Sequence, residues 1–393
     1  MHKDLKISII GVGYVGLSIA AVFSEKANIK IFDKDKEKLN LISKGLSPIL
    51  ENDLIKLIKK NYSRIQVSSS LEDCVYDSDL AILALPTSFD EESNSFNTLI
   101  LEEVLQEVER INPKALKIIK STIPIGFTSK MNAKLETNKI IFVPEFLREG
   151  KSVFDNYYPQ RIIIGSDSRI RSIQNFITFQ KKVVKLKKVT FLKMCSSEAE
   201  AVKLFSNTFL ALRVAFFNEI DSFALSKELS AKNIIDGMSL DPRIGAFYNN
   251  PSFGFGGYCL PKDSKQTLTS FTGVDQKIIS AIIESNYLRK RLIAKDINAS
   301  KHSIIGIYRL SMKKDSDNFR ESAILEVINM LDPIKKVVIY EPLLNSKSFN
   351  GIDLNNNFED FASSCELIIA NRYHNELKPY SRKIYTRDIY QSD

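Results

Sequence analysis

Short apolar runs, separated by glycine, proline and polar residues, dominate the first third of the chain. Runs of β-favouring residues occupy positions 5–10, 29–32, 79–85, 117–120 and 140–143. An apolar stretch from Leu17 to Ser24 has helical character and separates the first two of them. Strands that alternate with helices are typical of a parallel sheet, so we predict an α/β fold.

The pattern changes after residue 195. The segment from Ser196 to Leu229 contains neither glycine nor proline, and its apolar positions recur every three or four residues. It therefore predicts one long helix that links two domains. More helical structure is expected after Asp263, as far as about Ile297. Between the two patterns, lysines alternate with apolar residues over 181–188, which predicts a strand with one solvated face.

The last part of the chain returns to strands and helices. Apolar runs at 303–308, 336–340 and 367–370 predict a second, smaller parallel sheet, and the segment 318–322 leads into a helix between the first two. This region has no glycine-rich turn after its first strand. We therefore expect it to bind a nucleotide differently from the first sheet.

The turn after the first strand carries the strongest local motif. Gly11, Val12, Gly13, Tyr14, Val15 and Gly16 stand between a strand and a helix, and Asp33 ends the next strand 22 residues after Gly11. Strand, glycines, helix, strand and acid at this spacing form the dinucleotide fingerprint. The glycines let a pyrophosphate approach the helix N-terminus. A carboxylate at Asp33 favours NAD over NADP, because a 2′-phosphate would meet a negative charge.

Polar residues follow three further strands of this sheet. Thr87 comes after one and Thr122 after another, each close to a proline, at the carboxyl edge where ligands of such sheets lie. Glu145 and Glu149 follow a third strand. Taken alone, these glutamates are equally consistent with a solvated loop and with a site.

One cysteine lies in a setting that suits a nucleophile. Cys259 follows a glycine-rich turn, Gly254 to Gly257, and precedes Lys262 and Asp263. Glycines allow close approach of a ligand, and a nearby ammonium favours the thiolate. The alternative is a buried structural cysteine after a turn. Lys203 and Asn207 stand four residues apart on the long helix and share one face. If this helix face is turned toward the cofactor, Lys203 and Asn207 would bind water or an oxyanion. If the face is turned to solvent, the two residues would have no functional role.

Composition narrows the class of protein. With 393 residues, 44% hydrophobic and 26% charged, the chain suits a soluble protein of two or three domains. The net charge is +8, but the basic residues are interleaved with acidic ones and form no nucleic-acid-binding motif. This basic excess suits a small anionic ligand. No apolar run reaches membrane-spanning length, so we expect a cytoplasmic protein. The cysteines form no CxxC pair, which indicates neither zinc nor disulfides: Cys74, Cys195, Cys259 and Cys365.

Taken in order, the motifs identify a family resemblance. They are GVGYVG, Pro-Thr, STIPIG, PEFLREG, EAVKLFSNT, YNNPSFGFGGYCLPKD and MKKDSDNFRES. The chain closely resembles the nucleotide-sugar 6-dehydrogenases of the UDP-glucose/GDP-mannose dehydrogenase family, and within them the short bacterial members that oxidise UDP-glucose. The resemblance runs essentially end to end.

The resemblance implies three domains and a homodimer. Residues 1–193 would form an NAD-binding Rossmann domain, and residues 194–298 a central helical domain that dimerises and carries the cysteine turn. Residues 299–393 would form a C-terminal Rossmann-like domain that binds the UDP-sugar. Neither a nucleic acid nor a membrane is implied as a partner.

The resemblance also implies binding residues. Besides the glycine turn, the NAD contacts would be Val12, Asp33, Lys38, Thr87, Thr122, Glu149, Lys262 and Arg320. The substrate contacts would be Glu145, Phe146, Leu147, Arg148, Glu149, Lys203, Asn207, Tyr248, Asn249, Asn250, Pro251, Ser252, Gly256, Tyr258 and Lys313. Arg243 matches an arginine that reaches the site of the other subunit, and Arg387 is the candidate for the family's C-terminal arginine. Phe255 replaces a tyrosine that is frequent in relatives, so a hydroxyl contact is lost there.

The implied reaction converts UDP-glucose, two NAD⁺ and water to UDP-glucuronate and two NADH. Cys259 would capture the intermediate aldehyde as a thiohemiacetal and carry it to a thioester that water hydrolyses. Lys203 and Asn207 would stabilise oxyanions, and Thr122 and Asp263 would position water. Glu145 or Glu149 would act as general base, with a pKa raised by burial. The scheme requires no metal.

Three alternatives remain at this point. The substrate could be another nucleotide sugar, such as UDP-N-acetylmannosamine, UDP-N-acetylglucosamine or GDP-mannose. A related enzyme that oxidises only once, like a hydroxyacid dehydrogenase, would not need Cys259. A non-catalytic NAD-binding scaffold would need neither the thiol nor the set formed by Lys203, Asn207 and Asp263.

Overall fold

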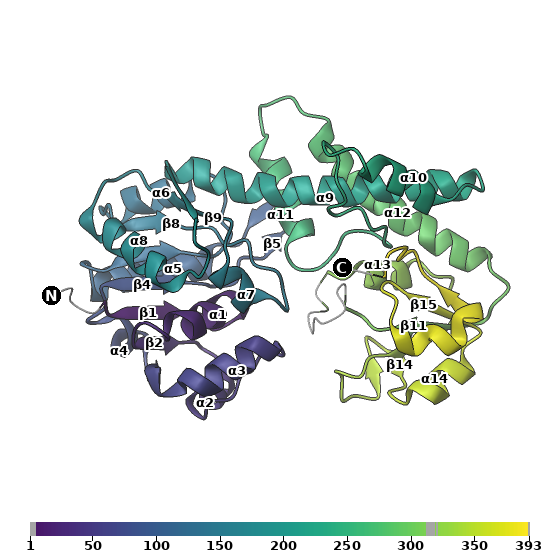
Figure 1. Cartoon of the computed structure of the whole chain (residues 1–393), viewed down its shortest axis with the longest axis horizontal. Helices are drawn as coiled ribbons and strands as arrows, with labels where there is room; N and C mark the ends of the chain where they lie inside the picture. Colours follow the sequence, from purple (N-terminus) through teal and green to yellow (C-terminus); the bar gives the residue numbers. More distant parts are fainter. Residues whose placement is uncertain (1–4, 312–318, 320, 392–393) are drawn as a thin grey trace. The chain divides into compact units, whose positions relative to one another are not determined.

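The computed structural model describes residues 5–311, 319 and 321–391 (Figure 1). The chain divides into two compact units, with the boundary between Phe205 and Ser206. Each unit contains a parallel-dominated sheet of its own. Within the described ranges, no helix has the length and apolar character that crossing a membrane requires.

The sheet of the first unit has the strand order β10-β9-β8-β7-β4-β1-β2-β3. The strands from β3 to β8 in this order all run parallel. This confirms the predicted parallel sheet. The β9 strand adds antiparallel to β8, which the sequence did not predict, and β10 adds parallel to β9. The bounds are β1 (Ile7–Ile10), β2 (Ile29–Phe32), β3 (Ile65–Val67), β4 (Leu80–Leu83), β7 (Leu116–Ile119), β8 (Ile140–Phe142), β9 (Arg161–Gly165) and β10 (Thr190–Met194).

Helices cover both faces of this sheet because successive strand residues point to opposite sides. Ile9 packs into one apolar cluster, with residues of α1, α3, α7 and α8, whereas Ile10 packs into another with residues of α4, α5 and α6. The bounds are α1 (Tyr14–Phe23), α2 (Lys36–Ser43), α3 (Asn52–Asn61), α4 (Leu71–Val75), α5 (Leu99–Ile111), α6 (Phe127–Lys134), α7 (Ser152–Tyr157) and α8 (Arg171–Val183). A small hairpin of β5 (Phe89–Asp90) and β6 (Ser95–Phe96) follows β4.

The strand predicted over 181–188 is wrong. Residues up to Val183 belong to α8, and the next strand, β10, begins only at Thr190. Phe176, Ile177, Gln180 and Val183 are buried, at the three- and four-residue spacing of a helix. The helical period therefore continues into the segment whose lysines and valines suggest alternation.

The predicted long helix is present as α9 (Ser196–Ser226), and the boundary between the units falls within it. It is followed by α10 (Ala231–Ser239). The helical structure expected after Asp263 is present as two helices, α11 (Leu260–Ser270) and α12 (Ile278–Ala299). Gly273 lies between them with a φ of +82°, a conformation that glycine adopts readily and that ends helices.

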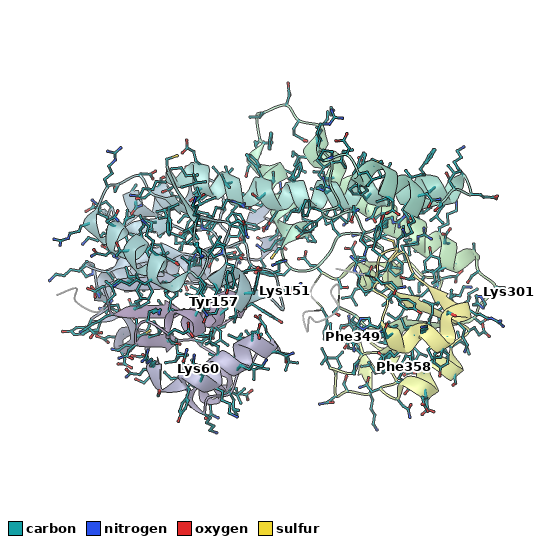
Figure 2. All side chains as sticks on the ribbon, in the orientation of Figure 1. Lys60, Lys151, Tyr157, Lys301, Phe349 and Phe358 are labelled. Carbon is teal, nitrogen blue, oxygen red and sulfur yellow. The ribbon has the colours of Figure 1, made fainter. Side chains whose placement is uncertain are left out.

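The sheet of the second unit has the order β13-β14-β12-β11-β15-β16. It is parallel apart from its edge strand β13, which confirms the predicted second sheet. Tyr308, Tyr340 and Phe358 pack ring against ring beside this sheet. Figure 2 labels Phe358 among the side chains of this unit. The bounds are β11 (Ile304–Tyr308), α13 (Ala323–Asn329), β12 (Lys336–Tyr340), β13 (Ser348–Phe349), β14 (Ile352–Leu354), α14 (Phe358–Ser364), β15 (Leu367–Ala370) and β16 (Ile384–Tyr385).

Candidate active site

The turn after β1 is shaped for close approach of a ligand. A Cβ added at Gly11 would lie 2.3 Å from the Ala84 carbonyl oxygen, and Gly11 has a φ of +91°. A Cβ at Gly16 would lie 1.8 Å from the Gly11 oxygen, whereas one at Gly13 would meet open space. Gly11 and Gly16 thus let the chain fold tightly, and Gly13 leaves room above the turn. Tyr14, Val15 and Gly16 already belong to the first turn of α1.

Asp33 lies beside this turn. Its carboxylate accepts the Val12 N–H at 2.7 Å and the Asp35 N–H at 2.9 Å. Among the described residues no side chain caps the N-terminus of α1, so that helix end favours an anion. Lys38, in the first turn of α2, pairs at 3.5 Å with Asp35, the N-cap residue of that helix. The glycine turn, the uncapped N-terminus of α1 and the half-buried Asp33 carboxylate together fit a bound dinucleotide.

The predicted threonines lie together at the carboxyl edge of the sheet. The Thr87 hydroxyl donates to the Thr122 carbonyl at 2.6 Å, and the Ser121 hydroxyl accepts the Leu85 N–H at 2.8 Å. These bonds tie the segment after β4 to the segment after β7. Both threonines are buried, so their orientation is fixed by the fold.

Glu145, which is partly buried, forms an ion pair with the buried Lys203 in the first unit. The Lys203 ammonium donates to a Glu145 carboxylate oxygen at 2.9 Å and to the Glu145 carbonyl at 2.7 Å. Burial alone would raise the pKa of the Glu145 carboxyl, but the Lys203 charge and the Leu147 N–H outweigh it and hold that pKa below its ordinary value. The raised pKa expected for Glu145 is therefore wrong, and this carboxylate is ionised at neutral pH.

The rest of the PEFLREG segment is held by its neighbours. The Arg161 guanidinium lies over the Phe146 ring, 4.2 Å from its centroid. Arg148 pairs with Asp155 of α7 at 2.6 Å. Leu147 donates its N–H to the Glu145 carboxylate at 2.8 Å, and Glu149 is half-buried beside Gly150. Within this segment Glu145 therefore points inward, whereas Arg148 is held by its ion pair with Asp155 of the following helix, α7.

Lys120 is a charged residue of this site that the sequence analysis did not single out. It follows β7 directly and is buried, and the charges that act on it are those of Glu145 and Lys203. Burial lowers the pKa of the Lys120 ammonium to about 8, with Glu145 opposing and Lys203 adding to the effect. The sequence does contain a signal for Lys120: it directly precedes Ser121 and Thr122, at the carboxyl edge of the sheet where a ligand is expected.

In the second unit, Cys259 stands at the start of α11. It occupies the N-cap position and is half-buried, where the helix dipole favours negative charge. The turn before it needs glycine: Gly254 has a φ of +145°, and a Cβ there would lie 2.8 Å from the Asn286 side-chain oxygen. Asn286 also holds both backbone groups of Phe255, at 2.7 and 2.9 Å.

Behind Cys259 lies a buried polar chain. The Lys262 ammonium donates to Asp263 at 2.9 Å, and the Asn207 amide donates to the other Asp263 oxygen at 2.5 Å. Burial would lower the pKa of Lys262, but the charges of Asp263 and Cys259 outweigh it and raise that pKa. Lys262 thus keeps its charge at neutral pH. Its ammonium also lies 5.0 Å from the centroid of the Tyr258 ring.

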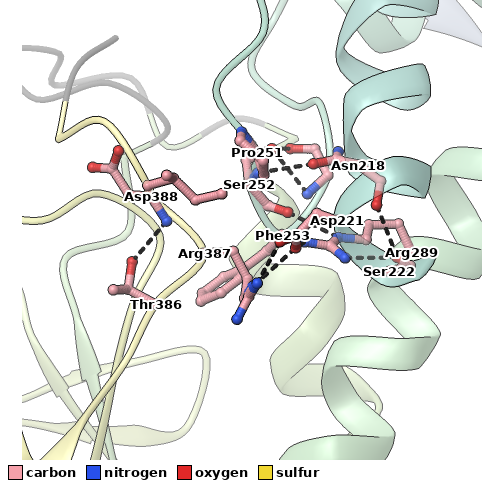
Figure 3. A network of polar contacts seen from close by, with 12 residues as sticks. Asn218, Asp221, Ser222, Pro251, Ser252, Phe253, Arg289, Thr386, Arg387 and Asp388 are labelled. Carbon is pink, nitrogen blue, oxygen red and sulfur yellow. Dashed lines mark hydrogen bonds and ion pairs between the residues drawn. The ribbon is translucent and has the colours of Figure 1, made fainter. Parts of the chain in front are cut away.

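The predicted sugar-nucleotide loop, residues 248–252, is braced by a polar network (Figure 3). Ser252 donates its N–H to Asn218 at 2.8 Å, and its carbonyl accepts from Arg289 at 3.0 Å. Arg289 and Arg387 both pair with the buried Asp221 (Figure 3). Arg387 is therefore committed to this network rather than presented outward.

The remaining loop residues are held individually. Asn249 donates to the Ser239 hydroxyl at 3.0 Å, Asn250 to Asp388 at 2.7 Å, and Arg372 to the Pro251 carbonyl at 3.2 Å. Tyr248 is exposed with a φ of +53°. Gly256 is half-buried within the cysteine turn.

Arg243 points into solvent on the single chain. Its guanidinium pairs with Asp241 of the same turn at 2.6 Å. Arg213 supports that turn by donating to the carbonyls of Ile244 and Phe247, at 3.1 and 2.7 Å. Lys313 and Arg320, two further predicted contacts, lie outside the described residues. In the described part of the chain, no group of three or more His, Cys, Asp or Glu side chains is placed to hold a metal ion.

Comparison with known proteins identifies the family. Residues 5–178 match the NAD binding domain of the UDP-glucose/GDP-mannose dehydrogenase family, residues 197–287 its central domain and residues 306–390 its UDP binding domain. The UDP-glucose 6-dehydrogenase of Campylobacter jejuni is 44% identical over 99% of this chain and 100% of that protein. That of Streptococcus pneumoniae is 41% identical over 98% of this chain and 99% of that protein.

A solved structure supports the fold. The UDP-glucose dehydrogenase of Pyrobaculum islandicum superposes with a TM-score of 0.87, at 24% identity, over 99% of this chain and 96% of that one. Together with the end-to-end sequence matches, this establishes that the chain belongs to the UDP-glucose/GDP-mannose dehydrogenase family.

Proposed function

We propose that this chain is a UDP-glucose 6-dehydrogenase, which converts UDP-glucose, two NAD⁺ and water to UDP-glucuronate and two NADH. The observation that carries the proposal is Cys259 at the start of α11, beside the buried Lys262–Asp263 pair, in a chain that also has a dinucleotide turn. The near-complete matches to enzymes of that name support the substrate.

The glycine turn and Asp33 would hold the cofactor. Bound NAD⁺ supplies the hydride acceptor for both oxidations. Gly11 and Gly16 permit the tight turn, the start of α1 receives the pyrophosphate, and Asp33 accepts from the adenosine ribose. Lys38, Thr87, Thr122, Glu149 and Lys262 stay predicted contacts.

Cys259 makes the second oxidation possible. An aldehyde is a poor hydride donor until a nucleophile adds to it. The Cys259 thiolate forms a bond to C6, and the carbonyl oxygen becomes an alkoxide. Departure of a hydride from that thiohemiacetal leaves a thioester. Water then adds to C6, the C–S bond breaks, and the carboxylate leaves while the thiol is restored.

The polar residues have separate roles in this scheme. Lys203 and Asn207 stabilise the oxyanion, because a fixed cation and an amide donor act strongly in a dry site. Asp263 and Thr122 position water. Glu145 is ionised and able to accept a proton from water, and Glu149 is the alternative base.

We further propose the three-domain division at residues 193 and 298, and a homodimer formed through the central region. Three phenylalanines of α9, at steps of seven residues, are exposed on the single chain: Phe209, Phe216 and Phe223. Side chains seven apart lie on one helix face, and such a face is apolar where helices associate. The exposed Arg243 would reach the partner's site. A cytoplasmic location suits the reactive thiol of Cys259.

The number of NADH molecules formed per sugar tests the function. With limiting UDP-glucose and excess NAD⁺, the purified protein should form about two NADH per sugar and release UDP-glucuronate, as two hydride transfers require. One NADH with free aldehyde would mean a single-step alcohol dehydrogenase. No NADH from UDP-glucose, but two from an N-acetylated or guanosine-linked sugar, would keep the mechanism and replace the substrate.

Mixing two inactive chains tests the shared site. Arg243→Ala and Cys259→Ala chains should each be inactive, whereas exchanged heterodimers should regain activity because one of their two sites is complete. Absence of recovery in a mixture shown to exchange subunits would contradict the sharing of Arg243.

A further inference from the structure

Glu200 of α9 is a buried acid that the proposed reaction does not use. One of its carboxylate oxygens accepts the Gly126 N–H at 2.5 Å, and the other accepts the Thr128 N–H at 2.9 Å. These N–H groups belong to the N-terminus of α6, whose N-cap, Gly126, has no side chain that could cap the helix. Glu200 is 0% exposed, so water does not compete for these bonds. A carboxylate of one helix therefore caps another helix.

The first turn of α9 lies directly against the sheet. A Cβ added at Gly165, the last residue of β9, would lie 2.5 Å from the Ala199 Cβ and 3.2 Å from the Ser196 Cα. Asp167, just beyond β9, accepts the Ser196 N–H at 2.9 Å and the hydroxyl of Ser129, on α6, at 2.7 Å. The N-terminal end of α9 is therefore fastened both to the end of β9 and to α6.

The Glu200 bonds also close a ring of contacts at the carboxyl edge of the sheet. Gly126 ends the segment that leads from β7 through Thr122 to α6. Lys203 lies three residues after Glu200, about 4.5 Å further along the helix axis, and donates to Glu145 at 2.9 Å. Glu145 follows β8, which pairs parallel with β7. The ring runs from β7 to α9 and returns through β8, and all its members lie in the first unit.

We propose that Glu200 is a positioning residue, which holds α9 on the sheet where the Lys203 ammonium meets both Glu145 and the C6 oxygen of the substrate. This inference rests on the proposed function, which assigns stabilisation of the oxyanion to Lys203. Glu200 touches neither substrate nor cofactor in this scheme and acts through Lys203. Because a fixed charge stabilises an oxyanion only where it is aimed, a shift of about 1 Å in α9 would lower the rate on the order of 100-fold.

Glu341 of the second unit provides a matched control. It too is buried and accepts two backbone N–H groups, those of Leu310 at 2.9 Å and Leu343 at 3.3 Å. Burial raises the pKa of both carboxyls, Glu200 and Glu341, so their surroundings are alike. Glu341 follows β12, to which the reaction scheme assigns no residue. The same substitution at both positions therefore separates the loss of a buried carboxylate from the loss of alignment.

The experiment measures kcat, KM and the melting temperature for the wild type, Glu200→Gln, Glu200→Ala and Glu341→Gln, with the kinetics recorded well below the lowest melting temperature. Glutamine keeps one acceptor oxygen but turns an amide N–H toward the other donor, and alanine removes both acceptors. We expect kcat to fall roughly 10-fold in Glu200→Gln and roughly 100-fold in Glu200→Ala. Glu341→Gln should keep kcat within about twofold of the wild type.

The Michaelis constants show whether the effect is confined to the chemistry. In the Glu200 variants, KM for NAD⁺ should change by less than about threefold, because Asp33 and the glycine turn are held by a contact of their own. A loss of general order would instead raise KM for NAD⁺ together with the fall in kcat.

A double variant separates positioning from a general structural role. If Glu200 acts through Lys203, Glu200→Gln should lower kcat less than about twofold in a Lys203→Met background, although it slows the wild type roughly 10-fold. A merely structural acid would lower both rates by the same factor, and that result would overturn the proposal.

A folded Glu200→Gln variant with kcat within about twofold of the wild type would also overturn it. If Glu200→Ala does not fold, the glutamine variant and the double variant decide. The wild-type NADH count separates this inference from the proposed function. Two NADH per UDP-glucose from the wild type, with a fully active Glu200→Gln, would overturn this inference alone. If only another nucleotide sugar yields NADH, the substrate is wrong and the same variants are measured with that sugar. If none does, both proposals fail.

Discussion

The two parallel sheets begin with the same backbone turn but place different side chains in it. Gly11 follows β1 with a φ of +91°, and Arg309 follows β11 with a φ of +59°. Each donates its N–H to the last carbonyl of the neighbouring strand, Phe32 at 2.9 Å and Tyr340 at 2.8 Å. The first turn has no side chain at this position, whereas the second carries Arg309, whose guanidinium lies 5.8 Å from the centroid of the Tyr308 ring. The two sheets thus share a backbone geometry but not the side chain placed on it.

The acids that follow the second strand of each sheet extend the parallel. Asp33 accepts the N–H of Val12 at 2.7 Å, and Glu341 accepts that of Leu310 at 2.9 Å. Asp33 is half-buried, but Glu341 is only 1% exposed. In both sheets a backbone N–H of the turn thus donates to this acid. Only the acid of the first sheet is exposed enough to contact a ligand as well.

Gly11→Ala should have the largest effect. The new Cβ would lie 2.3 Å from the Ala84 oxygen in a φ region that alanine disfavours, so the turn must move. We expect kcat/KM for NAD⁺ to fall roughly 100-fold or more. Arg309→Gly is the control in the second sheet: glycine adopts its φ freely, so the melting temperature should stay near that of the wild type. Equal destabilisation by both substitutions would contradict the comparison.

Asp33→Asn should have an intermediate effect, confined to the cofactor. Asparagine still accepts the Val12 N–H but no longer repels a 2′-phosphate. The ratio of kcat/KM for NAD⁺ to that for NADP⁺ should fall by roughly tenfold, with the melting temperature little changed. A wild type that uses both cofactors equally would refute the role of Asp33.

Glu341→Gln should have the smallest effect, and on stability alone. Burial raises the pKa of the Glu341 carboxyl above its ordinary value of 4.5. This group therefore favours folding most below pH 4.5 and loses that contribution as the pH rises through the raised pKa. Urea unfolding should show a cost of about 1 kcal/mol in acid and less at neutral pH. A larger loss of unfolding free energy at neutral pH, or a changed preference between NAD⁺ and NADP⁺, would contradict the purely structural role of Glu341.

The sequence predicted what depends on local spacing. The glycine turn, Asp33, both sheets and the long helix α9 follow from patterns within a few tens of residues. The strand predicted over 181–188 is wrong because a helical period and a lysine–valine alternation look alike over short windows, and α8 continues to Val183. The cluster of Lys120, Glu145 and Lys203 depends on strand register and on helix packing over long distances along the chain. Its charge balance, and hence the lowered pKa of Glu145, could not be read from motifs.

The most direct test of the account is the covalent intermediate on Cys259. Serine is a weaker nucleophile, and its ester hydrolyses more slowly than a thioester, so turnover of Cys259→Ser should fall by orders of magnitude while an adduct accumulates. Mass spectrometry of the protein, quenched after mixing with UDP-glucose and NAD⁺, should then find a UDP-glucuronoyl group on the peptide that contains position 259. Unmodified protein that still forms two NADH per sugar would contradict capture by Cys259.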